Sequence, residues 1–158
     1  MLNDGLRLTH STLFSKFSDK SFFAFPYDEV SQNSTAITGN IGLIISPKDG
    51  WRIAPLFSTA FRTPNVDDLS KVFESASGNL IVPNPDLKPE HTYNYELSNS
   101  KTFDNKFQLG FTAYYSVYKN ALTIERSTFN GQSHIQYEGV LSTVSTIANK
   151  ARAYILWV

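Results

Sequence analysis

The chain of 158 residues carries 14 Lys and Arg against 14 Asp and Glu, so its formal net charge is zero. This balance gives no overall field that would attract nucleic acid, and the absence of cysteine excludes disulfides, thiolate metal sites and cysteine nucleophiles. No run reaches the roughly 20 apolar residues of a membrane helix, and the first ten residues lack the apolar core of a signal peptide.

The first two predicted strands lie at residues 5–18 and 35–46. The alternation of the first strand slips near His10, which predicts a bulge there. The second strand alternates more clearly, with one face formed by Ile37, Ile41, Leu43 and Ile45. Alternation with period two is typical of a strand that has one apolar and one polar face.

Residues 49–64 predict a third strand with aromatic residues at both ends of one face. Ten such residues, tilted by about 45°, rise roughly 23 Å, close to the ~25 Å apolar band of outer-membrane barrels. Pro55 lies within this strand. Because proline cannot donate a hydrogen bond to a neighbouring strand, we expect a bulge or a local break there.

The remaining predicted strands cover residues 91–103, 106–120 and 146–158. The middle one alternates over about 15 residues, far longer than the 5–6 residues common in globular proteins. Lys101 interrupts an apolar face near one end, where its long side chain can reach the membrane interface. In the last strand we expect one apolar face formed by Ile147, Ala151, Ala153, Ile155 and Trp157.

Short and long connections alternate along the chain. Residues 47–50 and 104–106 are tight turns, whereas residues 18–34, 63–90 and 119–146 are long connections. Transmembrane barrels alternate short periplasmic turns with long extracellular loops. In the second long loop, Asn65 and the acidic pair after it predict a short helix. In the third, Asn130-Gly131 predicts a tight turn in a projecting ribbon.

The sequence offers no catalytic constellation. His10, His91 and His134 lie far apart and lack the spacing of metal ligands, and there is no phosphate-binding loop or nucleophile elbow. We therefore predict that the protein is not an enzyme and that it binds no metal or cofactor.

Polar side chains on the second face of the strands are the candidate site. We expect some of them to line a solute path or to contact an internal plug, although a barrel interior is polar in any case because it is wet. The candidates are Arg52, Arg62, Asn94, Glu96, Gln108, Thr112, Lys150 and Arg152.

Residues 61–97 resemble the barrel of TonB-dependent outer-membrane receptors. The resemblance rests on paired motifs: Phe61-Arg62-Thr63-Pro64, Asp67-Asp68-Leu69, Asn84-Pro85-Asp86-Leu87-Lys88-Pro89-Glu90 and Tyr95-Glu96-Leu97. It implies import of a scarce ligand, such as a ferric siderophore, haem, cobalamin or an oligosaccharide. It also implies contact with outer-membrane lipid, a plug domain that fills the barrel and the TonB energy-transducing complex. Haem receptors that resemble this chain place a histidine between the two main motifs. This chain has none there, so the resemblance does not identify the ligand.

Together these patterns predict an all-β fold, an antiparallel up-and-down meander of about six long strands with long extracellular loops and one short loop helix. Residues 1–158 would form a partial barrel domain in the outer membrane, without a plug, because six strands cannot close a barrel of about 22. The alternatives are a soluble all-β ligand- or carbohydrate-binding module, in which the aromatic face would be a dry core, and a small complete porin-like barrel.

Overall fold

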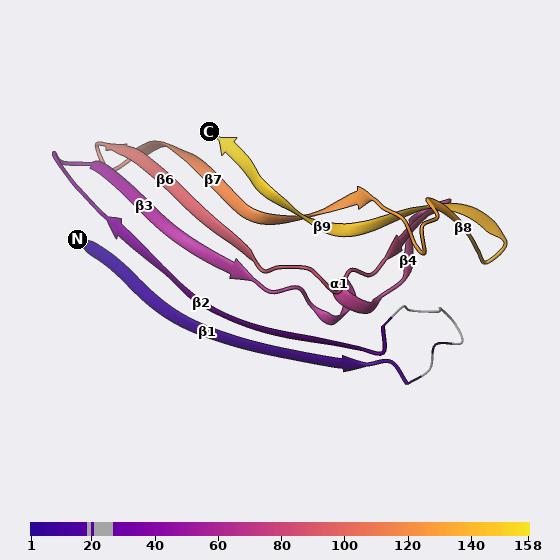
Figure 1. Ribbon diagram of the computed structural model, residues 1–158. Helices are drawn as coiled ribbons and strands as arrows, with labels where there is room; N and C mark the ends of the chain where they lie inside the picture. The colour runs from indigo at the N-terminus through magenta and orange to yellow at the C-terminus, as the bar shows by residue number, and fades with distance from the viewer. Residues whose placement is uncertain (19, 21–26) are drawn as a thin grey trace.

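The computed structural model describes residues 1–18, 20 and 27–158. Six long strands dominate it (Figure 1): β1 (Leu2–Lys16), β2 (Glu29–Leu43), β3 (Trp51–Arg62), β6 (Glu90–Phe103), β7 (Phe107–Arg126) and β9 (Val140–Trp157). Short elements lie in the connections between them: α1 (Val66–Ser70), β4 (Phe73–Ala76), β5 (Asn79–Val82) and β8 (His134–Tyr137). The predicted all-β fold with one short loop helix is confirmed.

The strands form one open sheet in the order β1-β2-β3-β6-β7-β9-β5-β4, and β8 pairs with β9 beside this path. The long strands follow each other in antiparallel pairs, as predicted for an up-and-down meander. The loop between β3 and β6 adds one pairing that the sequence did not predict. It brings β5 back to the sheet, where Asn79–Val82 runs parallel to Thr143–Thr146 of β9.

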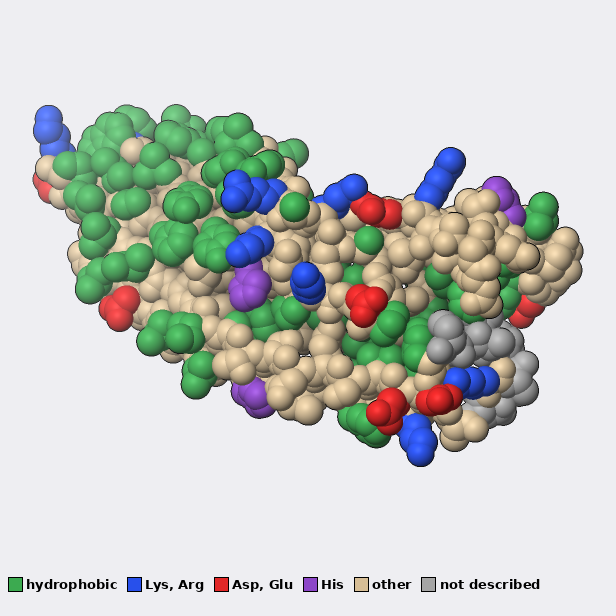
Figure 2. All heavy atoms as spheres, in the orientation of Figure 1, with side chains coloured by type: hydrophobic (Ala, Val, Ile, Leu, Met, Phe, Trp, Pro, Cys, Tyr) green, Lys and Arg blue, Asp and Glu red, His purple; other side chains and the backbone are tan. Residues whose placement is uncertain are grey.

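One face of the sheet, here called the outer face, is apolar and exposed. Leu6 is 84% exposed and Leu156 is 70% exposed. Aromatic rings cross this face from strand to strand, with centroids 5.0 Å apart for Phe57 and Tyr95 and 6.1 Å apart for Tyr115 and Tyr154. Hydrophobic side chains gather over this part of the sheet in Figure 2. A soluble sandwich would cover this face with a second sheet, whereas all the described strands belong to one sheet.

Several apolar side chains lie on the inner face near the end of the sheet that carries the long loops, although Phe14 of β1 stays on the outer face and is 63% exposed. In β1, Leu8 lies on the outer face, whereas Leu13 packs on the opposite, inner face. Leu13 belongs to a cluster built around three buried residues, Val30, Leu69 and Leu87, which Phe17, Tyr27, Leu122 and Ile147 also contact. The core of the protein therefore lies under the loops and not between two sheets.

This change of face corrects two predictions. The bulge expected near His10 is wrong, because β1 and β2 pair without interruption from Leu2–Leu43 to Lys16–Glu29. The first and third long connections are also shorter than expected, since β2 begins at Glu29, β7 continues to Arg126 and β9 begins at Val140. Apolar residues that move to the inner face break the alternation without ending the strand.

The local break expected at Pro55 is confirmed. β2 and β3 pair at Asn40–Gly42 and again at the isolated bridge between Ile45 and Ile53, but not at Leu43 and Pro55. The pairing of β3 with β6 on its other side runs unbroken past Pro55. Proline thus removes one hydrogen-bond donor from one side of the strand only.

The tight turns also follow the predictions. Asp104 and Asn105 have φ values of 47° and 55°, and Asn130 and Gly131 have 50° and 79°. Residues with short side chains tolerate this left-handed region in tight turns. The ribbon of β8 and β9 turns at a second such pair, Glu138 and Gly139.

Lys101 Nζ donates to the Asp49 carbonyl at 2.6 Å and lies 5.6 Å from the centre of the Trp51 ring. No helix in the described ranges is long and apolar enough to span a membrane.

We expect Leu69→Ala to destabilise the loop region by about 2–5 kcal/mol, because Leu69 is fully buried and its truncation leaves a cavity. Hydrogen exchange of the Leu69 and Lys71 amides, which close the helix onto Asn65 and Asp67, measures this loss in the folded protein. Val66→Ala in the same helix is the control, since Val66 is 47% exposed. Equal protection in the two variants would contradict the assignment of Leu69 to the core.

Candidate functional site

The centre of the inner face is a strip of hydrogen-bonded polar side chains. The pairing aligns Ser58, Asn94 and Ser116 in one row across β3, β6 and β7. Ser116 Oγ donates to Asn94 Oδ1 at 2.6 Å, and the Ser98 and Thr112 hydroxyls lie 2.8 Å apart. Ser98 Oγ also contacts Glu96 Oε1 at 3.3 Å. The structure thus brings together three of the predicted candidates: Asn94, Glu96 and Thr112.

Arg52 and Gln108 lie on the same face at the end with the tight turns. Both line a hollow of about 500 Å³ between the turn at residues 46–50 and the ends of β6 and β7. The hollow is wide open to solvent, and its polar lining includes Ser100 and Thr102. These two candidates are therefore separated from the central strip and belong to the mouth of the inner face.

The last strand differs from the prediction. Arg152 pairs directly with Lys119, and Tyr154 two residues further on pairs with Val117 and stacks on Tyr115 of the outer face. Since directly opposite residues share a face, Arg152 and Lys150 lie on the outer face and not in the inner strip. Both faces of β9 carry apolar residues near its C-terminal end. Alternation alone therefore could not decide which of its side chains point to the outer face.

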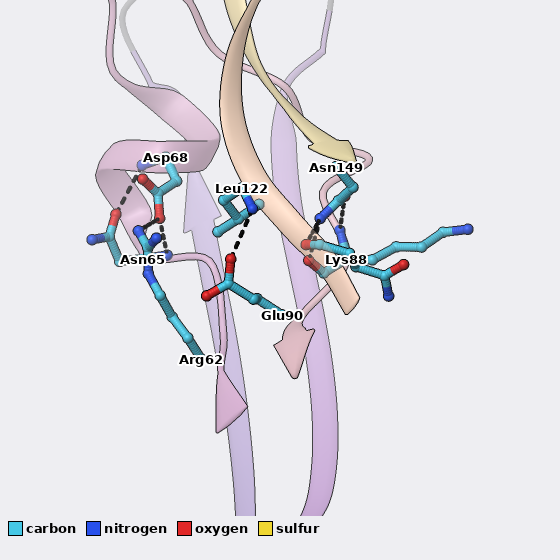
Figure 3. Close-up of polar contacts among 8 residues, drawn as sticks. Arg62, Asn65, Asp68, Lys88, Glu90, Leu122 and Asn149 are labelled. Carbon is cyan, nitrogen blue, oxygen red and sulfur yellow. Dashed lines mark hydrogen bonds and ion pairs between the residues drawn. The ribbon is translucent and has the colours of Figure 1, made fainter. Parts of the chain in front are cut away.

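The first motif, Phe61 to Pro64, fastens the start of α1 to the end of β3 (Figure 3). Arg62 Nη2 lies 3.0 Å from Asp68 Oδ2, and the same carboxylate oxygen accepts the Asn65 N–H at 3.1 Å. Asn65 Oδ1 accepts the Asp68 N–H at 2.8 Å, which completes a reciprocal helix cap. Pro64 is fully buried, and the centre of the Phe61 ring lies 5.0 Å from that of His91.

The second motif, Asn84 to Glu90, fastens the return of the loop to β7 and β9. Asn84 Nδ2 donates to the Ile147 carbonyl at 3.0 Å, Leu87 is buried in the core, and Pro85 lies exposed at a turn. The Pro89 carbonyl accepts a bond of 3.3 Å from Asn120 Nδ2. Glu90 Oε2 accepts the Leu122 N–H at 2.9 Å (Figure 3).

Three residues that the sequence analysis missed complete the contacts that hold residues 84–90 against the sheet, here called the clamp. Asn149 accepts the Lys88 N–H at 2.7 Å and donates at 2.9 Å to the carbonyls of Lys88 and Asn120. Gln32 Nε2 donates to the Leu87 carbonyl at 2.6 Å. Asn120 has a φ of 56° inside β7. Asparagine is depleted in strands, so its presence at positions 120 and 149 was the available signal.

The pKa shifts in the loop region have local physical causes, which are burial and neighbouring charges. Burial raises the pKa of Tyr27 to about 12, and its hydroxyl contacts the Leu69 carbonyl at 3.3 Å. The Lys20 ammonium hydrogen-bonds to the exposed Asp28 carboxylate and lowers the pKa of Asp28. Burial also raises the pKa of Tyr137, with Glu138 and Glu74 adding to the effect. Among the described residues, no three His, Asp or Glu side chains lie close enough together to hold a metal ion.

We expect Asp68→Ala to weaken the helix cap by about 1–2 kcal/mol, because it removes the reciprocal capping bond and the partner of Arg62. Hydrogen exchange of the Leu69 amide, which bonds to the Asn65 carbonyl, should then become about five to thirty times faster. Asp67→Ala is the matched control, since the Asp67 side chain is 66% exposed and that of Asp68 only 11%. Similar exchange rates for both variants would contradict the role of the Asn65–Asp68 cap in holding the loop.

Comparisons with known proteins give matches of three kinds. Residues 1–154 match the family model described as TonB dependent receptor-like, beta-barrel. An iron-regulated outer membrane virulence protein of Vibrio cholerae serotype O1 (strain ATCC 39315 / El Tor Inaba N16961) is 32% identical over 93 residues, which cover 53% of this chain and 14% of that protein. The third is a solved structure, a double mutant of the Serratia marcescens hemophore receptor HasR in complex with its hemophore HasA and heme. It superposes with a TM-score of 0.68 at 10% identity, covering 98% of this chain and 28% of the receptor.

The HasR likeness concerns the fold alone, because the identity is low. The family match spans nearly the whole chain, and it agrees with the open antiparallel sheet, the apolar outer face and the clamped loop. These findings also place the protein in the outer membrane. The chain belongs to the TonB-dependent receptor-like β-barrel family.

Proposed function

We propose that this chain contributes part of the barrel wall of a receptor that imports an iron-containing ligand, a ferric siderophore or haem, across the outer membrane. The observation that carries the proposal is the hydrogen-bonded strip on the inner face, between the clamped loop and the open mouth at Arg52 and Gln108. The name of the iron-regulated relative and the heme complex of the structural neighbour support iron as the cargo.

The loop end and the middle of the inner face would have different roles. At the loop end, the contacts of Arg62, Glu90 and Asn149 hold the loop over the sheet, where a ligand arrives from outside. In the middle, hydroxyl, amide and carboxylate groups offer weak and exchangeable hydrogen bonds. Such a wall suits a hydrated passage or the surface of an internal plug, because no single strong site would trap the ligand.

A transport role agrees with the family. Glu96 has Ser98 as its hydrogen-bonding neighbour among the described residues, and no second carboxylate pairs with it. In the complete receptor, we propose that a plug domain lies against this strip and that the TonB complex supplies the energy for its movement.

We expect Glu96→Lys, in the complete receptor that contains this chain, to slow initial uptake of ferric siderophore or haem about tenfold, equivalent to roughly 1.4 kcal/mol. The added ammonium would disturb the strip through which the ligand or plug contacts the wall. Uptake of each radiolabelled ligand is measured in iron-starved cells, with the amount of receptor at the surface quantified in parallel.

Glu138→Lys is the matched control, because Glu138 lies in the turn between β8 and β9 and makes the same change of charge. Unchanged uptake by Glu96→Lys would refute the role of the strip. Uptake that persists in cells without TonB would refute the proposed function as a whole.

A further inference from the structure

Two exposed cations face each other on the outer face. Lys119 of β7 and Arg152 of β9 are directly paired, on the same face as Tyr115 and Tyr154. In Figure 2, Lys, Arg and His side chains lie along the border of the region where hydrophobic side chains gather. The inner strip and its proposed ligand path therefore do not involve this pair.

The pair lies just beyond the apolar band of the outer face. From Phe107 to Val117, β7 presents an apolar residue at almost every second position. Ten residues extend about 34 Å along a strand, or about 24 Å across a membrane at a tilt of about 45°, which matches the ~25 Å band of outer-membrane barrels. Lys119 is the next residue on this face, on the side of the long loops. The two cations thus lie at the level of the lipid headgroups.

Nothing in the described structure neutralises the two charges. Lys150, on the same face, forms an ion pair with Glu125. Lys119 and Arg152 have no carboxylate within ion-pair distance among the described residues. Like charges directly opposite each other destabilise a strand pair. An anion shared between them would turn this repulsion into attraction.

The backbone beside the pair is held in place. Asn120, the residue after Lys119, adopts a φ of 56°, donates to the Pro89 carbonyl and accepts on its own carbonyl from Asn149. The partner of Lys119 on the other side is His91, whose ring lies 5.0 Å from that of Phe61. The cations therefore project from a fixed part of the sheet, which lowers the cost of binding a ligand there.

An apolar groove begins below the cations. It has a volume of about 610 Å³ and is lined on the outer face by residues of β2, β3, β6, β7 and β9. Pro55 and Ala113 supply small side chains in its lining. Its upper part includes Tyr115 and Leu156, each four residues along the strand from Lys119 and Arg152, or about 14 Å. A groove of this size accommodates a ligand chain.

We propose that Lys119 and Arg152 bind the phosphate of a phosphorylated lipid of the surrounding membrane, with an acyl chain of that lipid lying in the groove. Arginine and lysine pair well with phosphate oxygens, and arginine does so with two parallel hydrogen bonds. A membrane lipid is the occupant that joins an anionic head to an apolar chain at this height, because the groove lies within the band that faces hydrocarbon. The proposal rests on the membrane location of the chain and not on the imported ligand.

The test uses the complete receptor in neutral detergent, stripped of lipid and titrated with dimyristoyl phosphatidic acid or dimyristoyl phosphatidylcholine while bound lipid is counted by native mass spectrometry. We expect phosphatidic acid to bind at least tenfold more tightly than phosphatidylcholine. Lys119→Gln with Arg152→Gln should abolish this preference. The control pair, Lys48→Gln with Lys106→Gln, removes the same charge from the tight turns and should leave the preference intact.

Two further measurements distinguish the contribution of the lipid head group from that of the acyl chain. Ala113→Leu fills the groove and should weaken the binding of both lipids about tenfold while the preference for phosphatidic acid remains. Inorganic phosphate should compete only weakly, because it has no acyl chain. The proposal is overturned if the Lys119 and Arg152 variant keeps the preference, if the control pair loses it equally, or if inorganic phosphate alone removes it. Unaltered binding by Ala113→Leu overturns the role of the groove. Each of these results is independent of ligand uptake.

Discussion

The structure depends on the change of solvent along its long strands. Within the membrane the outer face meets hydrocarbon, and neighbouring strands must satisfy the backbone because lipid offers no hydrogen bonds. Beyond the membrane the outer face meets water, so apolar side chains gain free energy only by turning inward. Leu8 and Leu13 of β1 show both situations on one strand. The core around Val30, Leu69 and Leu87 exists because the strands continue past the membrane.

That core explains why the family motifs have their composition. The loop between β3 and β6 must leave one strand, contribute α1 and β5, and return to the neighbouring strand. Each end is held by a proline-containing motif with a polar clamp, Arg62 with Asp68 at the start and Glu90 with the Leu122 amide at the return. Leu69 and Leu87 anchor the two halves in the same cluster. The motif residues thus chiefly hold the loop in place above the inner face.

The two faces of the sheet have separate chemistry. The inner face carries hydroxyls, amides and one carboxylate that hydrogen-bond within the strip, and these groups offer exchangeable hydrogen bonds to the ligand or plug that we propose. The outer face carries apolar side chains bounded by aromatic residues and by the cations at one end. Because side chains on a strand point alternately to opposite faces, substitutions can address one face and leave the other unchanged.

The sequence by itself determined the fold class, the six long strands, the helix cap at Asn65, the tight turns and the break at Pro55. These depend on alternation and on local backbone preferences, which a short window contains. It also placed Arg52, Arg62, Asn94, Glu96 and Gln108 on one face. Only the tertiary structure decided where the strands end, because the inward turn of Leu13 and Leu122 looks like lost alternation. Only pairing with β7 placed Arg152 on the outer face, since both faces of β9 carry apolar residues. The clamp formed by Asn120 and Asn149 likewise joins positions that only the folded sheet brings together.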